Sequence, residues 1–377
     1  MSKRIVIIGG GFAGLRAAGA LAKRGNDFQV ILIDMRREFT FSPWLIDAVA
    51  GEKSAKEYTI DLEVISKREN FTFIQGVANR IDREAKTVDV QDEKEMRSIG
   101  YDCLINCPGA KTAYYNIPGA KEHSLPLKTA DDVSVIHQRI EDLVAKGTAL
   151  NIAVVGAGPS GVESLFALRS FVDQACAKAG KPEIAKASAF SLVQGAPQIL
   201  PGFPNTIVDG SMRELGAKGF RVYLGEPVSE VTSEVVKTSK GSVIPANLVL
   251  WCAGIEANLV PVEPTVIADR AGYAIDRNLA IEPMVFSGGD AANYKETNVV
   301  IPKNAQTAMP MGLCLAENAA RACQDLPPIN FTYANRGNLI RLGETGFLDF
   351  RLFCVKTSLA PRIRNWFYKI RFTQMDS

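Results

Sequence analysis

An apolar segment that leads directly into a glycine-rich turn constrains this chain more than any other feature. Residues 5–8 (IVII) precede the pattern G-x-G-x-x-G at Gly9–Gly14, and residues 15–22 carry apolar side chains at helical spacing. A second apolar segment, residues 29–33, ends at Asp34, 20 residues after the turn. Strand, glycine turn, helix, strand and acid in this order are the fingerprint of a Rossmann-type unit that binds a dinucleotide.

The three glycines of the pattern have separate roles in such a unit. Gly9 allows the tight turn, Gly11 lets the backbone approach a pyrophosphate, and Gly14 lets the helix pack closely on the strand. The unpaired N–H groups and partial positive charge at the start of the helix favour phosphates, and Asp34 can accept hydrogen bonds from an adenosine ribose. The predicted binding loop consists of Gly9, Gly10, Gly11, Phe12, Ala13 and Gly14.

The same pattern recurs 147 residues later in the chain. Residues 151–155 (NIAVV) lead into G-x-G-x-x-G at Gly156–Gly161, a helix is predicted from residue 162, and the next apolar strand, 190–193, ends at Gln194. The second predicted loop contains Gly156, Gly158, Pro159, Ser160 and Gly161. Because the repeat is one of a whole folding unit, it predicts two dinucleotides, one held tightly and one exchanging.

The remaining segments predict an α/β chain with two Rossmann-like domains, one inserted into the other. Strands are predicted at 71–76, 101–106, 248–251 and 285–287, a hairpin at 80–90, and helices at 131–145 and 207–218. Two of these strands end in similar turns, at Gly109 and Gly254. The simplest topology inserts residues 116–265 into a first domain made of residues 1–115 and 266–345, and residues 346–377 form a separate tail.

Composition limits the remaining possibilities. A net charge of +2 over 377 residues gives no indication of nucleic-acid binding, and no segment reaches the ~18 consecutive apolar residues of a membrane-spanning helix. The first residues lead directly into a strand, so no signal peptide is expected. Seven cysteines without regular spacing favour a reducing cytosol over a disulfide framework. Neither His123 nor His137 has neighbours spaced as metal ligands, so no metal is expected.

Together these motifs resemble the two-dinucleotide-binding flavoproteins with a glutathione-reductase-like fold. The matching elements are the two glycine loops, Asp34, the turns 107–109 and 252–254, and Gly289 with Asp290. The resemblance implies that FAD occupies the first unit, where Asp290 binds its ribityl or pyrophosphate portion, and that NADH or NADPH enters the second. The implied FAD contacts also include Ala78, Cys107, Pro108, Gly109 and Gly289, and the implied NAD(P)H contacts include Pro159, Ser160, Ala253 and Gly254.

A closer resemblance, carried by three segments, is to the type II NADH dehydrogenases, single-chain enzymes that pass electrons from NADH to quinone. Residues 39–51 are similar to that family's loop after the first acid, residues 116–128 to its linker, and residues 301–308 (IPKNAQTA) to its quinone-side segment. The resemblance implies an FAD-dependent NAD(P)H:quinone oxidoreductase that uses a membrane quinone. Such an enzyme needs no proton pumping, since no spanning helices exist to carry protons.

The resemblance also implies roles for three residues near the reacting groups. Gln306 would lie at the pyrimidine edge of the flavin near the quinone, Lys303 would neutralise the reduced flavin, and Glu163 would handle protons. Each residue also has a structural alternative: Gln306 can be a polar residue at a helix start, Lys303 a solvated loop lysine, and Glu163 an acid favoured by the helix dipole. Pro310 stands where the family has a second glutamine, and a proline suits the start of a helix better than its interior.

Gln194 departs from the usual end of the second strand in an NAD site. Asp or Glu there holds the ribose 2′-hydroxyl and repels a 2′-phosphate, whereas a neutral Gln still forms hydrogen bonds but repels less. We therefore expect relaxed use of NADH and NADPH. No arginine follows within several residues, so a strong preference for NADPH is not predicted. The alternative is that Gln194 is a strand-end residue and that other groups hold the ribose.

The cysteines separate the candidate electron acceptors. Residues 35–60 contain no cysteine, so a disulfide reductase is not predicted, and Cys103, Cys107 and Cys252 are expected to be small core residues. A rival enzyme is a sulfide:quinone oxidoreductase, in which Cys176 and Cys354 would have to meet at the flavin. A rival of another class is a redox-sensing flavoprotein of the apoptosis-inducing-factor type, in which the nucleotide complex is itself the signal.

The tail from residue 349 to residue 377 differs in composition from the rest of the chain. Its basic residues are Arg351, Lys356, Arg362, Arg364, Lys369 and Arg371, and they alternate with aromatic and aliphatic residues. The stretch after Pro361 is too short to span a bilayer but fits an interfacial helix on anionic lipid. We therefore expect peripheral attachment to the cytoplasmic face of a membrane. The alternative is a helix packed on the protein or on the second subunit of a homodimer.

Overall fold

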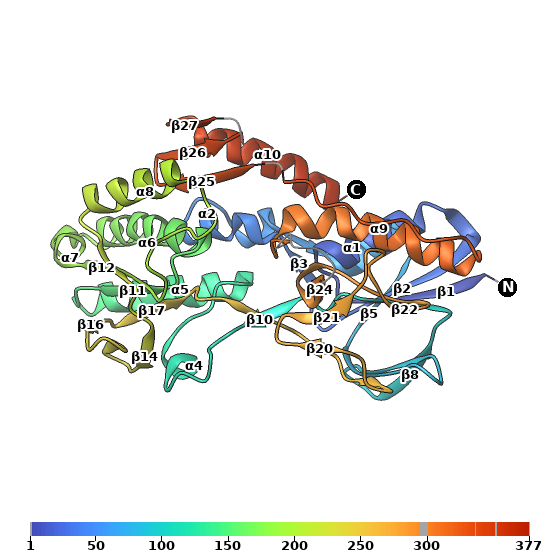
Figure 1. Ribbon diagram of the computed structural model, residues 1–377. Coiled ribbons are helices and arrows are strands. Elements are labelled where there is room, and N and C mark those ends of the chain that lie inside the picture. The colour runs from blue at the N-terminus through green and yellow to red at the C-terminus, as the bar shows by residue number, and fades with distance from the viewer. Residues whose placement is uncertain (1, 295–300, 336, 351–352, 377) are drawn as a thin grey trace.

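The computed structural model describes residues 2–294, 301–335, 337–350 and 353–376. Two α/β domains lie beside each other, and the C-terminal elements lie across the top of both (Figure 1). The first domain contains a six-stranded sheet of order β22-β23-β9-β1-β2-β5, in which only β22 is antiparallel to its neighbour. Its strands are β1 (Lys3–Ile8), β2 (Phe28–Asp34), β5 (Thr72–Gln75), β9 (Cys103–Asn106), β22 (Ala280–Glu282) and β23 (Val285–Ser287).

Residues 5–8 of β1 are all apolar and buried because both faces of the sheet are covered there. Ile5 and Ile7 point to the side that carries α1 (Phe12–Ala22) and α9 (Ala305–Cys323), whereas Val6 and Ile8 pack in a separate cluster. Helices α1 and α9 approach so closely that a Cβ at Gly312 would overlap a backbone oxygen of α1. The opposite face is covered by the sheet β19-β6-β7-β8, with β6 (Val77–Asp82), β7 (Thr87–Gln91), β8 (Met96–Gly100) and β19 (Val262–Glu263).

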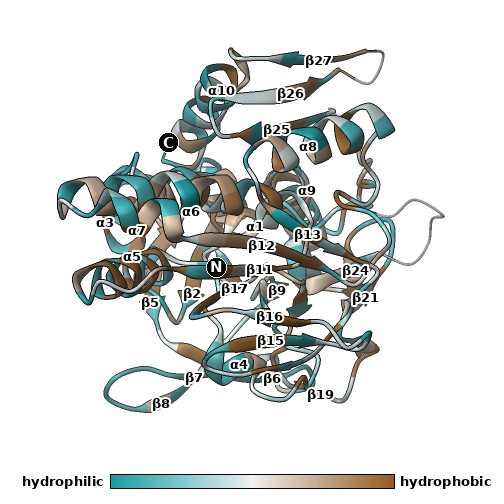
Figure 2. Ribbon diagram, turned by 90° about the vertical axis from the view of Figure 1, so that its left-hand side faces the viewer, coloured by the Kyte–Doolittle hydropathy of each residue, from teal (hydrophilic) through white to brown (hydrophobic). Residues whose placement is uncertain are grey.

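The second domain repeats this arrangement on a smaller scale. Its parallel sheet has the order β13-β12-β11-β17, which matches β5-β2-β1-β9 of the first domain. The strands are β11 (Asn151–Val155), β12 (Ala189–Gln194), β13 (Arg221–Leu224) and β17 (Leu248–Trp251). Helices α5 (Ala130–Ala145) and α6 (Pro159–Lys178) cover one face, and the sheet β14 (Val228–Val231), β15 (Val235–Thr238) and β16 (Val243–Pro245) covers the other. Strands β11 and β12 are mostly hydrophobic in Figure 2.

Several smaller elements connect these layers. The short helices are α2 (Leu45–Val49), α3 (Leu62–Glu69), α4 (Ala120–His123), α7 (Pro182–Ala187) and α8 (Asn205–Ala217), and the further strands are β3 (Glu38–Thr40), β4 (Thr59–Asp61), β20 (Ala268–Asp269), β21 (Gly272–Ile275) and β24 (Ala292–Tyr294). The helices predicted at 131–145 and 207–218 are α5 and α8, and the strand predicted at 71–76 is β5. The hairpin predicted at 80–90 is formed by β6 and β7.

The chain crosses between the two domains at a two-stranded antiparallel ribbon. Strand β10 (Ala110–Thr112) pairs with β18 (Ile255–Ala257), so the turn after β9 and the turn after β17 lie side by side. The Asn258 N–H donates to the Gly109 carbonyl oxygen at 2.9 Å, and the Ala113 N–H donates to the Gly254 carbonyl oxygen at 3.1 Å. The ribbon therefore holds the carboxyl-end turns of the two sheets together.

The C-terminal part forms an antiparallel sheet and a helix. The sheet consists of β25 (Asn338–Leu342), β26 (Thr345–Asp349) and β27 (Cys354–Thr357), and it is followed by α10 (Ala360–Met375). Helix α10 packs through Phe372, whose ring centroid lies 5.1 Å from that of Trp44, and through Tyr368. Arg351 and Leu352, which belong to the predicted tail, lie outside the described residues. Among the described helices none is both long and apolar enough to cross a membrane.

Candidate active site

Two glycines of the first loop have no room for a side chain, and the third has open space in front of it. Gly9 has a φ of +96°, and a Cβ at Gly9 would overlap the Cys107 carbonyl oxygen, while a Cβ at Gly14 would overlap the Gly9 carbonyl oxygen. A side chain at either of these two positions would clash with the protein's own backbone, so the fold requires glycine at both. Gly11 has an ordinary φ of −76° and a Cβ there would meet nothing within 4 Å, so its missing side chain leaves open the space before the first turn of α1.

Asp34 is held at this loop by two backbone N–H groups. Its Oδ2 accepts a hydrogen bond from the Gly10 N–H at 2.6 Å, and its Oδ1 accepts one from the Arg36 N–H at 2.8 Å. The carboxylate therefore lies at the end of β2, next to the loop, where a ribose hydroxyl could reach it. Ala78 is the second residue of β6 and lies three residues after Gln75, which pairs with Asp34.

The second loop reproduces the first. Gly156 has a φ of +99°, and Cβ atoms at Gly156 and Gly161 would overlap the Cys252 and Gly156 carbonyl groups, whereas a Cβ at Gly158 would meet nothing within 4 Å. Gln194 Oε1 accepts a hydrogen bond from the Ala157 N–H at 3.1 Å, as Asp34 does from Gly10. Gln194 thus takes the place of the acid in both position and hydrogen bonding.

Asp290 and two lysines form a charged cluster beside the first loop, where a Cβ at Gly289 would lie 3.4 Å from the Cβ of Ala13. Lys303 Nζ donates to the Asp290 carbonyl oxygen at 2.6 Å and also bonds the Ala271 carbonyl oxygen. Lys128 Nζ donates to the Ala110 carbonyl oxygen at 2.8 Å. Burial raises the pKa of the Asp290 carboxyl, and the positive charges of Lys128 and Lys303 oppose that rise. Lys303 is therefore not a freely solvated loop lysine, and Lys128 is a charged group that the sequence motifs alone did not place here.

Gln306 lies in the first turn of α9, which begins after the capping residue Asn304. Asn304 Oδ1 accepts a hydrogen bond from the Thr307 N–H at 3.0 Å, and the Gln306 side chain is exposed. Pro310 lies inside this helix rather than at its start. Because proline has no N–H, the Gln306 carbonyl oxygen lacks its usual partner four residues later.

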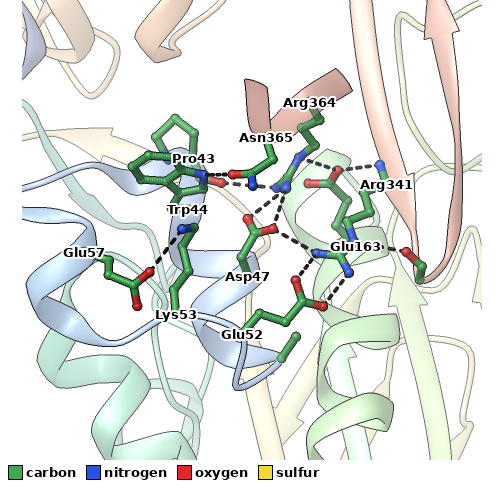
Figure 3. A network of polar contacts seen from close by, with 12 residues as sticks. Pro43, Trp44, Asp47, Glu52, Lys53, Glu57, Glu163, Arg341, Arg364 and Asn365 are labelled. Atoms are coloured by element: carbon green, nitrogen blue, oxygen red, sulfur yellow. Dashed lines mark hydrogen bonds and ion pairs between the residues drawn. The ribbon is translucent and has the colours of Figure 1, made fainter. Parts of the chain in front are cut away.

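Glu163 is buried within a network of charged groups from four elements (Figure 3). Its Oε1 accepts a hydrogen bond from the Arg341 N–H at 2.6 Å and lies 3.6 Å from Arg364 Nε. Asp47 of α2 accepts two hydrogen bonds from Arg364 Nη1, at 2.8 and 3.0 Å, and one from Arg341 at 2.8 Å. Burial raises the pKa of the Glu163 carboxyl, and the Arg364 charge opposes this rise. A free surface acid would not have these partners.

The network corrects one part of the tail prediction. Arg364 was expected among the basic residues that face anionic lipid, but its side chain is only 1% exposed. It shares the inward face of α10 with Ala360, Tyr368 and Phe372, which follow at intervals of four residues. This spacing was the available signal for a buried arginine. Asp47 and Arg341, the other members, were missed because their partners are distant in the sequence.

Four of the cysteines (Cys103, Cys107, Cys176 and Cys314) are buried, as expected for packing residues, whereas Cys252, Cys323 and Cys354 are partly exposed. All seven are free, and burial raises the pKa of both Cys107 and Cys252 to about 12, so neither is a reactive thiolate at neutral pH. Cys176 is buried in α6, 17 residues from the helix start at the second loop, which corresponds to about 25 Å along the axis. No group of three or more His, Cys, Asp or Glu suited to a metal ion is found among the described residues.

Comparisons with known proteins agree with this geometry. Residues 3–312 match the family model of the pyridine nucleotide-disulphide oxidoreductases. The chain is 26% identical over 358 residues to a type II NADH:quinone oxidoreductase of Staphylococcus saprophyticus, with 90% of this chain and 88% of the relative covered. It is 25% identical over 359 residues to the same enzyme of Staphylococcus aureus, with 91% and 88% covered.

The fold is shared with solved structures, among them an NDH2 and a sulfide:quinone oxidoreductase. NDH2 from Plasmodium falciparum in complex with NADH has a TM-score of 0.85 at 19% identity, with 100% of this chain and 98% of that chain covered. The sulfide:quinone oxidoreductase of Aquifex aeolicus has a TM-score of 0.82 at 18% identity, with 100% and 92% covered. The resemblance to type II NADH dehydrogenases that the sequence motifs predicted is confirmed by the curated relatives. Since the family model spans most of the chain, this protein belongs to the pyridine nucleotide-disulphide oxidoreductase family.

Proposed function

We propose that this protein is an FAD-dependent NAD(P)H:quinone oxidoreductase. The observation that carries the proposal is the pairing of β10 with β18, which brings the carboxyl-end turns of two glycine-loop domains together. The reacting end of a nucleotide bound at the second loop would then lie beside a nucleotide bound at the first loop. The names of the curated relatives, type II NADH:quinone oxidoreductases, support the choice of substrates. We assign residues 1–115 and 266–345 to the FAD domain and residues 116–265 to the NAD(P)H domain. Two strands depart from these bounds: β19 (Val262–Glu263) pairs with β6 of the first domain, and β25 (Asn338–Leu342) belongs to the C-terminal sheet.

The first loop fits FAD. Gly11 leaves room for a pyrophosphate at the start of α1, Asp34 is placed for a ribose, and the Asp290 carboxyl lies within the influence of the Lys128 and Lys303 charges. When bound, FAD accepts a hydride from a reduced nicotinamide and passes electrons to a second acceptor. We propose that Lys303 and Lys128 supply positive charge near the reduced cofactor, and that Gln306 at the start of α9 contacts its edge on the quinone side.

We propose that Glu163 holds a proton for quinone reduction. Its carboxyl group is shielded from water in the second turn of α6, and burial raises its pKa, which favours the protonated form. Arg364 and the Arg341 N–H stabilise the charged form, so they oppose the effect of burial on this pKa. A group with this balance can release a proton and later regain it.

The function is tested by anaerobic rapid mixing of the yellow holoprotein with NADH, NADPH or sulfide, followed by a quinone. We expect a nicotinamide nucleotide to bleach the flavin band rapidly and the quinone to restore it. Bleaching by sulfide alone would overturn the proposal in favour of a sulfide:quinone oxidoreductase, although the position of Cys176 far along α6 argues against that enzyme. Slow reoxidation by every quinone would instead favour a redox-sensing flavoprotein.

Gln194→Glu is expected to lower the NADPH-to-NADH ratio of kcat/KM by about tenfold or more. In the unchanged protein Gln194 Oε1 accepts a hydrogen bond from the Ala157 N–H, and a glutamate oxygen can accept the same bond. The glutamate also adds a negative charge that repels a 2′-phosphate. Gln91→Glu, on the exposed side of β7 in the other domain, is the control with the same change in net charge. An unchanged ratio in Gln194→Glu would show that other groups hold the ribose.

We propose that α10 attaches the protein to the cytoplasmic face of a membrane. The face opposite Arg364 presents Trp366, Phe367 and Ile370, which are 59%, 49% and 40% exposed. The exposed basic residues Arg362 and Lys369 flank them, a combination that suits anionic lipid. Seven free cysteines fit a reducing compartment on that side. A quinone dissolved in the membrane would then approach the network of Glu163 from the same side.

Replacing Trp366, Phe367 and Ile370 together by asparagine is expected to weaken binding to anionic vesicles by about 100-fold, because three apolar side chains no longer enter the interface. These residues point away from the protein, so NADH oxidation with a water-soluble acceptor should be retained. The control replaces Val64, Val243 and Ile267, three exposed apolar residues outside α10, by asparagine. Vesicle flotation measures both triple variants, and equal binding by the two would contradict membrane attachment through α10.

A further inference from the structure

Two consecutive residues between β10 and α4 adopt a backbone conformation that side chains rarely allow. Tyr115 has a φ of +54° and Asn116 a φ of +56°. This left-handed region is uncommon for any residue with a Cβ and especially for a bulky one. Such conformations persist only where surrounding structure holds them, and they cluster at functional sites. The segment lies beside the ribbon that joins the two domains, and the Tyr115 side chain is 52% exposed.

The Tyr115 side chain lies on the turn that follows β17. Its hydroxyl donates a hydrogen bond to the Ala253 carbonyl oxygen at 3.2 Å. Gly254 has a φ of +149°, and a Cβ at Gly254 would overlap the Tyr115 hydroxyl. Ala113, two residues before Tyr115, forms two hydrogen bonds with the same turn and strand. Its N–H donates to the Gly254 carbonyl oxygen, and its carbonyl oxygen accepts a hydrogen bond from Trp251 Nε1 at 2.8 Å.

The strand order shows which part of a bound nucleotide would reach this turn. In the second sheet β11 lies between β12 and β17. Gln194 at the end of β12 is the position for the adenosine ribose, and the loop Gly156–Gly161 after β11 is the position for the pyrophosphate. The next position along the sheet edge is the turn Ala253–Gly254. The nicotinamide half therefore falls beside Tyr115, on the side that the ribbon joins to the first loop.

We propose that Tyr115 is a positioning residue for the nicotinamide half of NAD(P)H. Its ring covers the nicotinamide nucleoside, and its hydroxyl oxygen, which donates to the Ala253 carbonyl, accepts a hydrogen bond from that nucleoside. The strained backbone at Tyr115 and Asn116 sets the ring over the turn, and Gly254 leaves the space for it. This inference rests on the proposed use of the second loop for NAD(P)H.

The test uses the FAD-loaded protein and compares NADH with ADP, which lacks both the nicotinamide and its ribose. Tyr115→Phe removes one hydrogen bond and is expected to raise the Kd for NADH about fivefold. Tyr115→Ala also removes the ring and is expected to raise that Kd about 20-fold and to lower the limiting rate of flavin reduction. The Kd for ADP, measured by calorimetry, should be unchanged in both variants.

Two further variants separate contact from strain. Asn116→Gly relieves one strained residue and leaves the tyrosine in place, so NADH binding should change less than twofold. Tyr223→Phe is the matched change on β13, at the far edge of the same sheet, and should have no effect. A parallel rise of the Kd values for ADP and NADH, or an unchanged Kd for NADH in Tyr115→Ala, would overturn the inference. Because no quinone is present, failure of the quinone reaction would not affect this test.

Discussion

Arg364→Met is expected to lower the free energy of unfolding by about 3–5 kcal/mol, the usual cost of removing one partner from a buried ion pair. The guanidinium forms two hydrogen bonds with Asp47 and lies 3.6 Å from the Glu163 carboxylate, and all three side chains are buried. Removing Arg364 leaves Asp47 with Arg341 as its remaining cationic partner in this network and deprives Glu163 of its nearest side-chain cation. Urea denaturation followed by fluorescence measures the loss.

Two variants of the same helix make this expectation specific. Arg362→Met removes an exposed positive charge two residues away and should change the free energy of unfolding by less than about 0.5 kcal/mol. Arg364→Lys keeps the charge but not the paired hydrogen bonds with Asp47, so an intermediate loss is expected. Equal stability of Arg364→Met and Arg362→Met would contradict a buried ion pair and return Arg364 to the lipid-facing side of α10.

The stability loss in Arg364→Met should also depend on pH. Burial already raises the pKa of Glu163 in the folded protein above its ordinary value, and without Arg364 the rise should be larger. A carboxyl group with a raised folded-state pKa binds a proton more readily when folded, so folding gains stability as pH falls through that pKa. The difference between Arg364→Met and the unchanged protein should therefore shrink as pH falls from neutral toward the ordinary pKa of glutamate.

A pair of alanine substitutions should separate the two nucleotide sites. Gly11→Ala is expected to weaken FAD binding at least about tenfold, and Gly158→Ala is expected to raise the Kd for NADH by a similar factor while FAD is retained. Both glycines have ordinary φ values, and an added Cβ would meet nothing within 4 Å in the protein itself. The added methyl group therefore affects the approaching pyrophosphate and not the fold.

The flavin-to-protein ratio after gel filtration and the rate of flavin bleaching by NADH measure the two effects independently. Gly19→Ala, in the middle of α1 and also without a contact within 4 Å for its Cβ, is the matched control and should change neither quantity. Loss of FAD in Gly158→Ala, or weakened NADH binding alone in Gly11→Ala, would reverse the assignment of the two sites. Loss of both ligands in either variant would indicate a damaged fold.

Much of the fold could be predicted because its signals are local. The strand, glycine turn and helix of each unit lie within about 30 consecutive residues, 3–22 in the first and 151–178 in the second, and the order of the motifs predicted that one domain is inserted into the other. The exposed half of α10 was also predictable from its aromatic and basic composition. The position of Pro310 was not predicted: the residue type favours a helix start, but Pro310 lies inside α9. The packing of α9 on α1 tolerates this proline at the cost of one backbone hydrogen bond.

The sequence by itself determined the two glycine loops and the acid or amide that follows each, because the spacing of a tight turn and a helix start depends on neighbouring residues. Only the tertiary structure decided that Asp47, Glu163, Arg341 and Arg364 meet, since about 300 residues separate the first from the last. It also decided that Tyr115 lies on the Ala253–Gly254 turn. These contacts depend on how α2, α6, β25 and α10 pack and on the ribbon of β10 with β18, and no local spacing encodes them.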